Sequence, residues 1–432
     1  MNLLYLPLVG LFFVSAGLKA DNDEYSFDTT EFEPKTFELT GYIEFEPEYA
    51  KANQEGTLYQ LQYFGLPPEE TLDQYTGTLE LEGYYRKGNA SLNFLAHSEI
   101  VWDNFGEEQD HKLYEGNFSY QARPGLVFDA GKKAMRWGKG YAWNPVAFVE
   151  RAKDAGDPDL AREGYWVIAA DWVKTFEGPL QTFAITTILL PTNDHINQDF
   201  GRTGHKNLAI KLYFLYRDVD IDLMYLTQGS FGSQVGMDFS KNLAPNFEIH
   251  GEFAYFNDIS HRTVTQDCRT GKAVVDDEIS YLLGLRYRTS SDITFLLEYY
   301  YNGRGNTLSQ QQQFYRCVHI ASETGDEDLL NQLPLNTDLD RGPFTKPNPM
   351  QKYVGFRTWW EEPWDMLYLT TALQIFYNVE DHSYSITPEL LYEGFDDVEI
   401  RLRGTMPVGD TLTEWGEKPN QFKLEAQIRL FF

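Results

Sequence analysis

The sequence predicts an all-β fold, a transmembrane antiparallel up-and-down β-barrel of about 18 strands, on three observations. Apolar and polar residues alternate with a period of two through many short segments, as in strands whose two faces meet unlike surroundings. Aromatic residues make up 16% of a chain whose mean hydropathy is −0.45. Tight turns alternate with longer polar connections, as in barrels with short turns at one end and long loops at the other.

The last strand alternates most clearly. One face carries apolar residues from Phe422 to Phe432, and the other carries Lys423, Glu425, Gln427 and Arg429, with Phe431 as the exception. A strand that ends on an aromatic residue resembles the closing strand of Gram-negative outer-membrane β-barrels, whose assembly machinery reads a terminal aromatic. The resemblance implies that Phe432 is an assembly signal and that this machinery is a partner. The alternative is a soluble β-protein that stops at this residue.

Composition excludes several classes. A helical membrane protein needs about 20 nearly continuous apolar residues for each span, and no such run follows the N-terminus. A net charge of −29 argues against nucleic acid as a partner, because phosphate binding requires clustered Lys and Arg. The acidic residues are either an ordinary solvated surface or external loops that meet divalent cations and lipopolysaccharide. Outer-membrane lipid and lipopolysaccharide are the expected surroundings.

The N-terminus predicts a secretory signal peptide over residues 1–20. Leu3 to Ala16 is an apolar run of suitable length, and cleavage after Ala16 or Ala20 fits the small residues there. A signal anchor is the alternative. A short acidic periplasmic segment, 21–35, then precedes the barrel, 36–432. That segment is too short to form a plug domain, which leaves a lumen of this size open to water.

Turn signals rich in Gly, Pro, Asn and Asp divide the chain into alternating segments. An even number of strands places both termini in the periplasm. The stretch 58–63 also alternates, but it would break this parity and is assigned to the first external loop. Sixteen strands is the alternative count. The expected strands are 36–47, 75–86, 90–103, 112–122, 125–133, 166–176, 180–190, 207–217, 219–228, 233–242, 246–257, 279–289, 292–302, 351–361, 366–379, 383–395, 398–408 and 421–432.

The polar faces of the strands predict a charged lumen with two unlike walls. The two walls meet where the first and last strands become neighbours, and opposed rows of charge would produce a transverse field that orients polar solutes. The alternative is that these charges pair and only keep the lumen wet. The basic wall consists of Arg286, Arg288, Arg357, Arg401, Arg403, Lys423 and Arg429, and the acidic wall of Glu38, Glu44, Glu46, Glu80 and Glu82.

The connection 136–166 combines Trp, Tyr and Gly with basic residues in an acidic chain. Connections of about 30 residues are functional or disordered, and this composition favours a packed loop. We expect it to fold inward and narrow the pore, with Arg136, Lys139, Arg151 and Arg162 lining the constriction. The alternative is an external loop whose Trp residues lie at the membrane interface.

Two features extend the resemblance to a family. Trp137-Gly138-Lys139-Gly140, followed by Asn144-Pro145, resembles a stretch that follows an early strand in porin-like outer-membrane proteins of poorly characterised function. The terminal Phe and the strand layout extend this over roughly 36–432. The resemblance is at the level of the class and names no substrate. General trimeric porins have fewer strands, so their pore residues cannot be transferred.

Cys268 and Cys317 lie in polar connections on the same external side, and an oxidising compartment favours a disulfide that ties two loops across the mouth. Two free thiols are the alternative. A short helix is expected near 323–332.

The expected function is an outer-membrane channel for small hydrophilic solutes, without cofactor or metal. No motif for nucleotide, zinc or redox chemistry is present, so an enzyme is not expected. The alternatives are a structural or export barrel whose lumen holds a partner, and a hydrolase sited at the rim. The oligomeric state is not predicted.

Overall fold

The computed structural model describes residues 35–151, 163–271, 274–333 and 344–432. The predicted signal peptide and nearly all of the acidic segment after it lie outside these ranges. Within the described residues, eighteen strands form one antiparallel sheet that closes on itself. It closes because β1 (Phe37–Ala52) pairs with both β2 (Thr71–Lys87) and β18 (Asn420–Phe431). Phe432 completes this seam, where its backbone exchanges two hydrogen bonds of 3.0 Å with Gly41.

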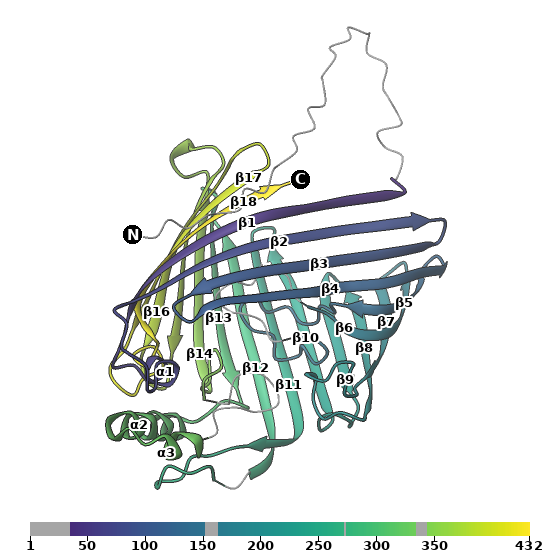
Figure 1. Ribbon diagram of the computed structural model, residues 1–432. Coiled ribbons are helices and arrows are strands. Elements are labelled where there is room, and N and C mark those ends of the chain that lie inside the picture. Colours follow the sequence, from purple (N-terminus) through teal and green to yellow (C-terminus); the bar gives the residue numbers. More distant parts are fainter. Residues whose placement is uncertain (1–34, 152–162, 272–273, 334–343) are drawn as a thin grey trace. The chain divides into compact units, whose positions relative to one another are not determined.

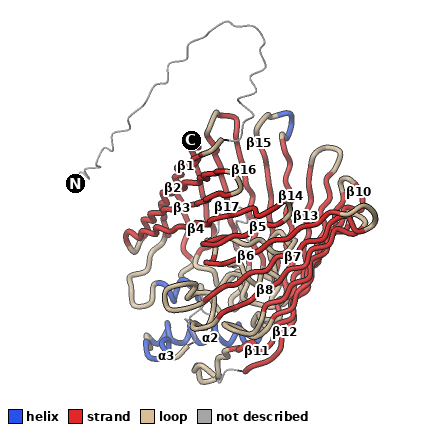
Figure 2. The backbone as a smooth tube through the Cα atoms, turned by 90° about the vertical axis from the view of Figure 1, so that its right-hand side faces the viewer, coloured by secondary structure: helices blue, strands red, loops and turns tan. Residues whose placement is uncertain are grey.

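The remaining strands follow one another around the barrel in chain order, which confirms an up-and-down topology with the predicted 18 strands and excludes the alternative of 16 (Figures 1 and 2). They are β3 (Ala90–Asp103), β4 (Gly106–Arg123), β5 (Leu126–Lys133), β6 (Tyr165–Thr175), β7 (Leu180–Pro191), β8 (Lys206–Tyr216), β9 (Val219–Leu226), β10 (Gln234–Ala244), β11 (Phe247–His261), β12 (Val274–Arg288), β13 (Ile293–Asn302), β14 (Lys352–Glu361), β15 (Leu369–Asn378), β16 (Tyr384–Phe395) and β17 (Val398–Val408).

The alternation sorts side chains between the outside and the lumen. In β1, Leu39, Ile43 and Phe45 are about half exposed on the outer surface, whereas Glu44 between them is buried in the interior. The same division runs around the barrel, where carboxylates such as Glu298 lie inside. A barrel whose outer surface is apolar and whose interior is polar has the pattern of a membrane-embedded strand wall.

The two ends of the barrel differ. At the turn end, where the chain finishes, strands are joined by tight reversals such as Arg217 and Asp218, whose φ angles of 50° and 58° suit a two-residue hairpin turn. Here the β14–β15 turn contains a 3₁₀ turn, η2 (Pro363–Asp365). At the loop end, long connections carry α1 (Thr57–Gln62), α2 (Leu308–Thr324) and α3 (Glu327–Asn331), which lie together in Figure 1. No helix among the described residues is long and apolar enough to cross a membrane.

Three segments at the loop end add to or differ from what the sequence predicted. The alternating stretch 58–63 lies in the first loop as expected, but it forms α1, where Tyr59 and Tyr63 stack one turn apart at 4.5 Å. Residues 106–111 belong to β4 and not to a loop. The short helix expected near 323–332 is present as α3, but the longer α2 before it was not expected. The two are separate because Gly325, with a φ of 65°, caps the end of α2.

Candidate functional site

Residues 134–151 of the connection between β5 and β6, here called the inward loop, lie inside the barrel. Its residues Trp137, Val146, Phe148 and Val149 are buried against apolar side chains on the inner surface of β6 to β11. Burying large apolar side chains against a matching apolar wall stabilises such a loop in place. The wall residues in this cluster are Val167, Ala169, Ile188, Leu190, Ala209, Met224, Leu226, Ala254 and Phe256.

Two buried carboxylates hold the backbone of this inward loop. Glu252 on β11 accepts hydrogen bonds of 2.6 Å from the backbone N–H groups of Lys139 and Gly140. Glu298 on β13 accepts bonds from the N–H groups of the next two residues, Tyr141 at 2.7 Å and Ala142 at 2.9 Å. Bonds to an ionised acceptor are roughly twice as strong as neutral ones, so four successive N–H groups fix the path of the loop across the lumen.

The loop then reaches the opposite wall through Trp143. The indole stacks on Tyr300 at 5.3 Å, packs against Phe376, and donates a hydrogen bond of 3.0 Å to Asn348. It lies flat on β14 because Gly355 has no side chain, and a Cβ there would come within 3.0 Å of the ring. The inward loop therefore contacts two walls of the barrel, β6–β11 and β12–β15.

We expect the double variant Glu252→Gln, Glu298→Gln to loosen the inward loop without opening the barrel. Each lost charged acceptor costs about 1.5–3 kcal/mol of loop anchoring. Single-channel recordings should then show a marked rise in open-state current noise. Glu361→Gln, on β14 at the turn end where the carboxylate pairs with Arg288, is the matched control. Noise equal to that of the control would contradict the anchoring role.

The four predicted constriction residues have different places. Lys139 approaches the buried Asp222 at 3.3 Å. Burial opposes its charge, but Asp222, Asp238 and Asp220 outweigh burial and raise the pKa of Lys139. Arg151 forms ion pairs with Asp199 and Glu163. Arg136 lines a cavity, described next, and Arg162 lies outside the described residues.

Two cavities border the inward loop. One, of about 650 Å³, places Arg136 opposite the carboxylates of Glu80, Glu82 and Glu115 on β2 and β4. The other, of about 460 Å³, lies between the loop and β13–β17. Its wall includes Lys139 and Tyr141 from the loop and Arg357, Arg401 and Glu389 from the strands. Both cavities therefore have charged groups of both signs on facing surfaces.

The predicted basic and acidic walls meet at the seam between β18 and β1. Arg429 on β18 contacts Glu44 on β1 at 2.6 Å. The other six basic-wall residues also have acidic neighbours, which lie outside the predicted acidic wall. Their partners are Glu389 for Arg357 and Arg403, Glu399 for Arg401, Glu48 and Glu425 for Lys423, Asp292 and Glu361 for Arg288, and the more distant Glu248 at 3.9 Å for Arg286.

The acidic wall is less uniform. Glu80 contacts His97 at 3.2 Å, and Glu46 accepts a hydrogen bond from Gln427. Glu82 lies in the larger cavity beside Arg136, and Glu38 lies near the turn end of β1. The carboxylates of Glu46, Glu48 and Glu425 gather within 4.8 Å of one another, and the ammonium of Lys423 contacts two of them.

Sequence reasoning missed the acidic residues that hold the loop. Glu252, Glu298, Asp222 and Asp238 are all buried in the lumen. Asp238 on β10 is the cross-strand partner of Asp222 on β9, and both carboxylates act on the charge of Lys139. The alternation of each strand places these residues on the inner face, but only the folded barrel reveals which of them faces the loop.

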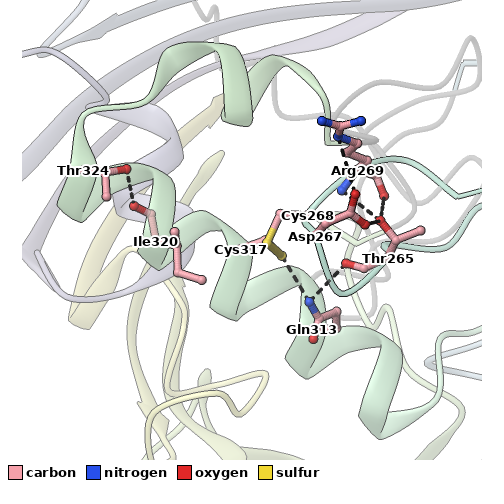
Figure 3. Close-up of a disulfide and its surroundings, with 8 residues drawn as sticks. All are labelled: Thr265, Asp267, Cys268, Arg269, Gln313, Cys317, Ile320 and Thr324. Atoms are coloured by element: carbon pink, nitrogen blue, oxygen red, sulfur yellow. Dashed lines mark hydrogen bonds and ion pairs between the residues drawn. A yellow bond between two sulfur atoms is a disulfide. The ribbon is translucent and has the colours of Figure 1, made fainter.

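At the loop end, α1, α2 and α3 lie together with the segments around Cys268 and Glu417, and we call this group of segments the cap. Cys268, in the β11–β12 connection, forms a disulfide with Cys317 of α2 (Figure 3). Beside it, Gln313 donates a hydrogen bond of 3.2 Å to the carbonyl of Thr265. Glu417 joins three further segments, because it accepts bonds from Thr57, the first residue of α1, from His319 of α2 and from the backbone of Leu412.

This cap should be tightest in mildly acidic solution. The hydrogen bond to Glu417 raises the pKa of His319 above its ordinary 6.5, with smaller effects of Glu323 and Glu55. Burial disfavours the charge of Glu417, but bonds from His319 and Thr57 lower its pKa below 4.5. The His319 contribution is complete below pH 6.5 and is lost as the pH rises through the raised pKa. The Glu417 contribution is complete above pH 4.5 and is lost as the pH falls through the lowered pKa.

Protease cleavage within α2, measured against pH, should therefore be slowest between about pH 4.5 and 6.5. His319→Gln keeps a hydrogen-bonding side chain without the charge and should remove the rise in cleavage above this window. A similar rise in the variant would contradict the role of His319.

Comparison with solved structures bears on the fold. No family model matches the chain, and no curated protein matches it by sequence. Among solved structures, OccK5 (OpdH) of Pseudomonas aeruginosa covers 91% of this chain and 98% of its own length, with 10% identity and a TM-score of 0.51. A double mutant of the Rhodopseudomonas blastica porin covers 92% of this chain and all of its own, with 10% identity and a TM-score of 0.44. The closed barrel of 18 strands and the similarity to OccK5 give this chain a porin-like fold.

Proposed function

We propose that this chain is an outer-membrane channel of a Gram-negative bacterium that lets small hydrophilic solutes diffuse through a charged lumen. The observation that carries the proposal is the inward loop. Glu252 and Glu298 hold this loop in the polar lumen of a closed barrel. A loop fixed inside a barrel of this width narrows the passage without filling it, and cavities of about 650 and 460 Å³ remain beside it.

In this proposal, passage is passive and needs neither a cofactor nor an energy source. A solute would cross between the basic residues Arg136 and Lys139 of the loop and the carboxylates of the facing strands. Charged side chains that line a narrow pore select solutes by charge as well as by size. No enzymatic activity is part of the proposal.

The surroundings follow from the same proposal. The signal peptide over 1–20 directs export, and the barrel-assembly machinery reads Phe432. The turn end then faces the periplasm, and the cap at the loop end faces outward, where its acidic side chains meet divalent cations and lipopolysaccharide.

Reconstitution tests the function. The mature protein should form stable open channels in planar bilayers, and liposomes that contain it should swell in small sugars and amino acids at rates that fall steeply with solute size. A set of solutes of equal size and different charge measures selectivity. A polypeptide that stays monomeric and soluble without detergent, or a barrel that is silent in bilayers, would overturn the proposal.

A further inference from the structure

A separate chamber of about 360 Å³ lies on the loop-end side of the inward loop. Its wall combines residues 142–151 of the loop with side chains from the β7–β8 and β9–β10 connections, from β11 and β13, and from the segment that precedes β14. The aromatic residues on this wall are Trp143, Phe148, Tyr165, Phe200, Phe231, Phe256 and Tyr300.

Three cations line this chamber, and they are not equivalent. Arg151 is neutralised by its ion pairs with Asp199 and Glu163. Neither Arg304 nor Lys346 has a carboxylate within ion-pair distance among the residues that the structure describes. The guanidinium of Arg304 instead lies 4.2 Å from the ring centre of Phe256, which leaves its N–H donors without an anionic partner.

The surroundings of these two cations disfavour their charge. Arg304 is open to solvent by surface area, yet the chain encloses it and burial lowers its pKa. The exposed surface of Arg304 and its enclosure by the chain are consistent, because the side chain lines the chamber. Burial, with a further effect of the Arg304 charge, lowers the pKa of Lys346 to about 8. Two uncompensated like charges in partly desolvated surroundings are costly, and a bound anion would remove the cost.

We propose that this chamber is a binding site for a small organic anion with a planar apolar body, which it captures above the constriction. Arg304 and Lys346 would receive the anionic group, and the aromatic wall would pack against the planar part. These aromatic side chains already pack against one another. The parts of them that line the chamber would add contacts with a planar ring that an inorganic anion cannot make. The proposal rests on the proposed channel function, because an anion bound here would lie next to the inward loop and could pass from the chamber into the passage beside it.

Binding is tested with phenylacetate as the probe, on the intact protein in detergent and in chloride-free buffer. Because Trp143 lines the chamber, its fluorescence should change in a saturable manner as phenylacetate is added. Phenylacetamide has the same shape without the charge, and acetate has the charge without the ring. Both should bind at least about tenfold more weakly, the difference expected when a charged hydrogen bond or a buried ring is lost.

The variants Arg304→Gln and Lys346→Met should each weaken phenylacetate binding by about tenfold or more. Arg217→Gln, in the tight turn between β8 and β9 at the turn end of the barrel, removes a charge of the same kind and should leave binding unchanged. Equal binding of phenylacetamide, unchanged binding in Arg304→Gln, or acetate and chloride competing as well as phenylacetate would each overturn the proposal.

Bilayer conductance measured on the same samples separates this proposal from the channel function. Open channels that fail to bind phenylacetate would reject the chamber alone. A silent barrel that still binds phenylacetate through Arg304 would reject the channel and retain the binding site.

Discussion

Removing residues 138–148 should raise single-channel conductance roughly threefold, because the inward loop occupies the lumen of a barrel wide enough for an aqueous pore. The deletion should leave the positions of the flanking residues nearly unchanged. The backbone N–H of Trp137 donates to the side chain of Glu150, so the two ends of the removed segment already lie close together. Two glycines suffice to join them. The cavities of about 650 and 460 Å³ beside the loop would then merge.

The deletion should also change selectivity, because it removes Lys139 and leaves Asp222 and Asp238 without their cation. The lumen then gains negative charge, and the reversal potential in a salt gradient should shift towards cation preference. Trp143→Ala is the matched control, since it keeps the length of the loop and removes only its contact with the far wall. Unchanged conductance and selectivity in a deletion variant that still folds as a barrel would reject the constriction.

The strands could be predicted from the sequence because the membrane-facing part of each one alternates under a strong constraint. The predicted bounds of β3 and β17 agree with the structure at both ends. The constraint ends where a strand leaves the apolar band. β4 begins at Gly106 with a run of charged residues on both faces, and only its pairing with β3, such as Glu108 with Val101, makes it a strand.

The candidate site could be predicted only in part, because its contacts join distant segments. The composition of 136–166 predicted a packed loop that folds inward, yet the carboxylate that holds Gly140 lies 112 residues away along the chain. The two charged walls illustrate the same limit. Alternation placed Arg429 and Glu44 in the lumen, and closure of the barrel predicted that their strands are neighbours. Their ion pair depends on the register of β18 against β1, which a sequence pattern does not encode.

Loss of the disulfide should loosen the cap while leaving the barrel closed. Cys268 and Cys317 are 49 residues apart, and a link of this length removes about 4 kcal/mol of chain entropy from the opened state. The double variant Cys268→Ser, Cys317→Ser should therefore expose α2 much more often. Both sulfur positions are nearly fully buried, in a cluster with Phe314 and Val318, so the serine hydroxyls add a further cost.

Limited trypsin digestion followed by mass spectrometry measures this effect, because Arg316 lies within α2 and the helix must unfold locally before trypsin can cleave there. Cleavage there should accelerate by at least about a hundredfold in the double variant, and reduction of the wild type should produce the same change. The strand pairing at the seam does not involve the cap, so the variant should keep the migration of a folded barrel on gels run without heating. Cleavage at an unchanged rate in both the variant and the reduced wild type would show that packing alone holds α2, and that the disulfide has no part in closing the loop end.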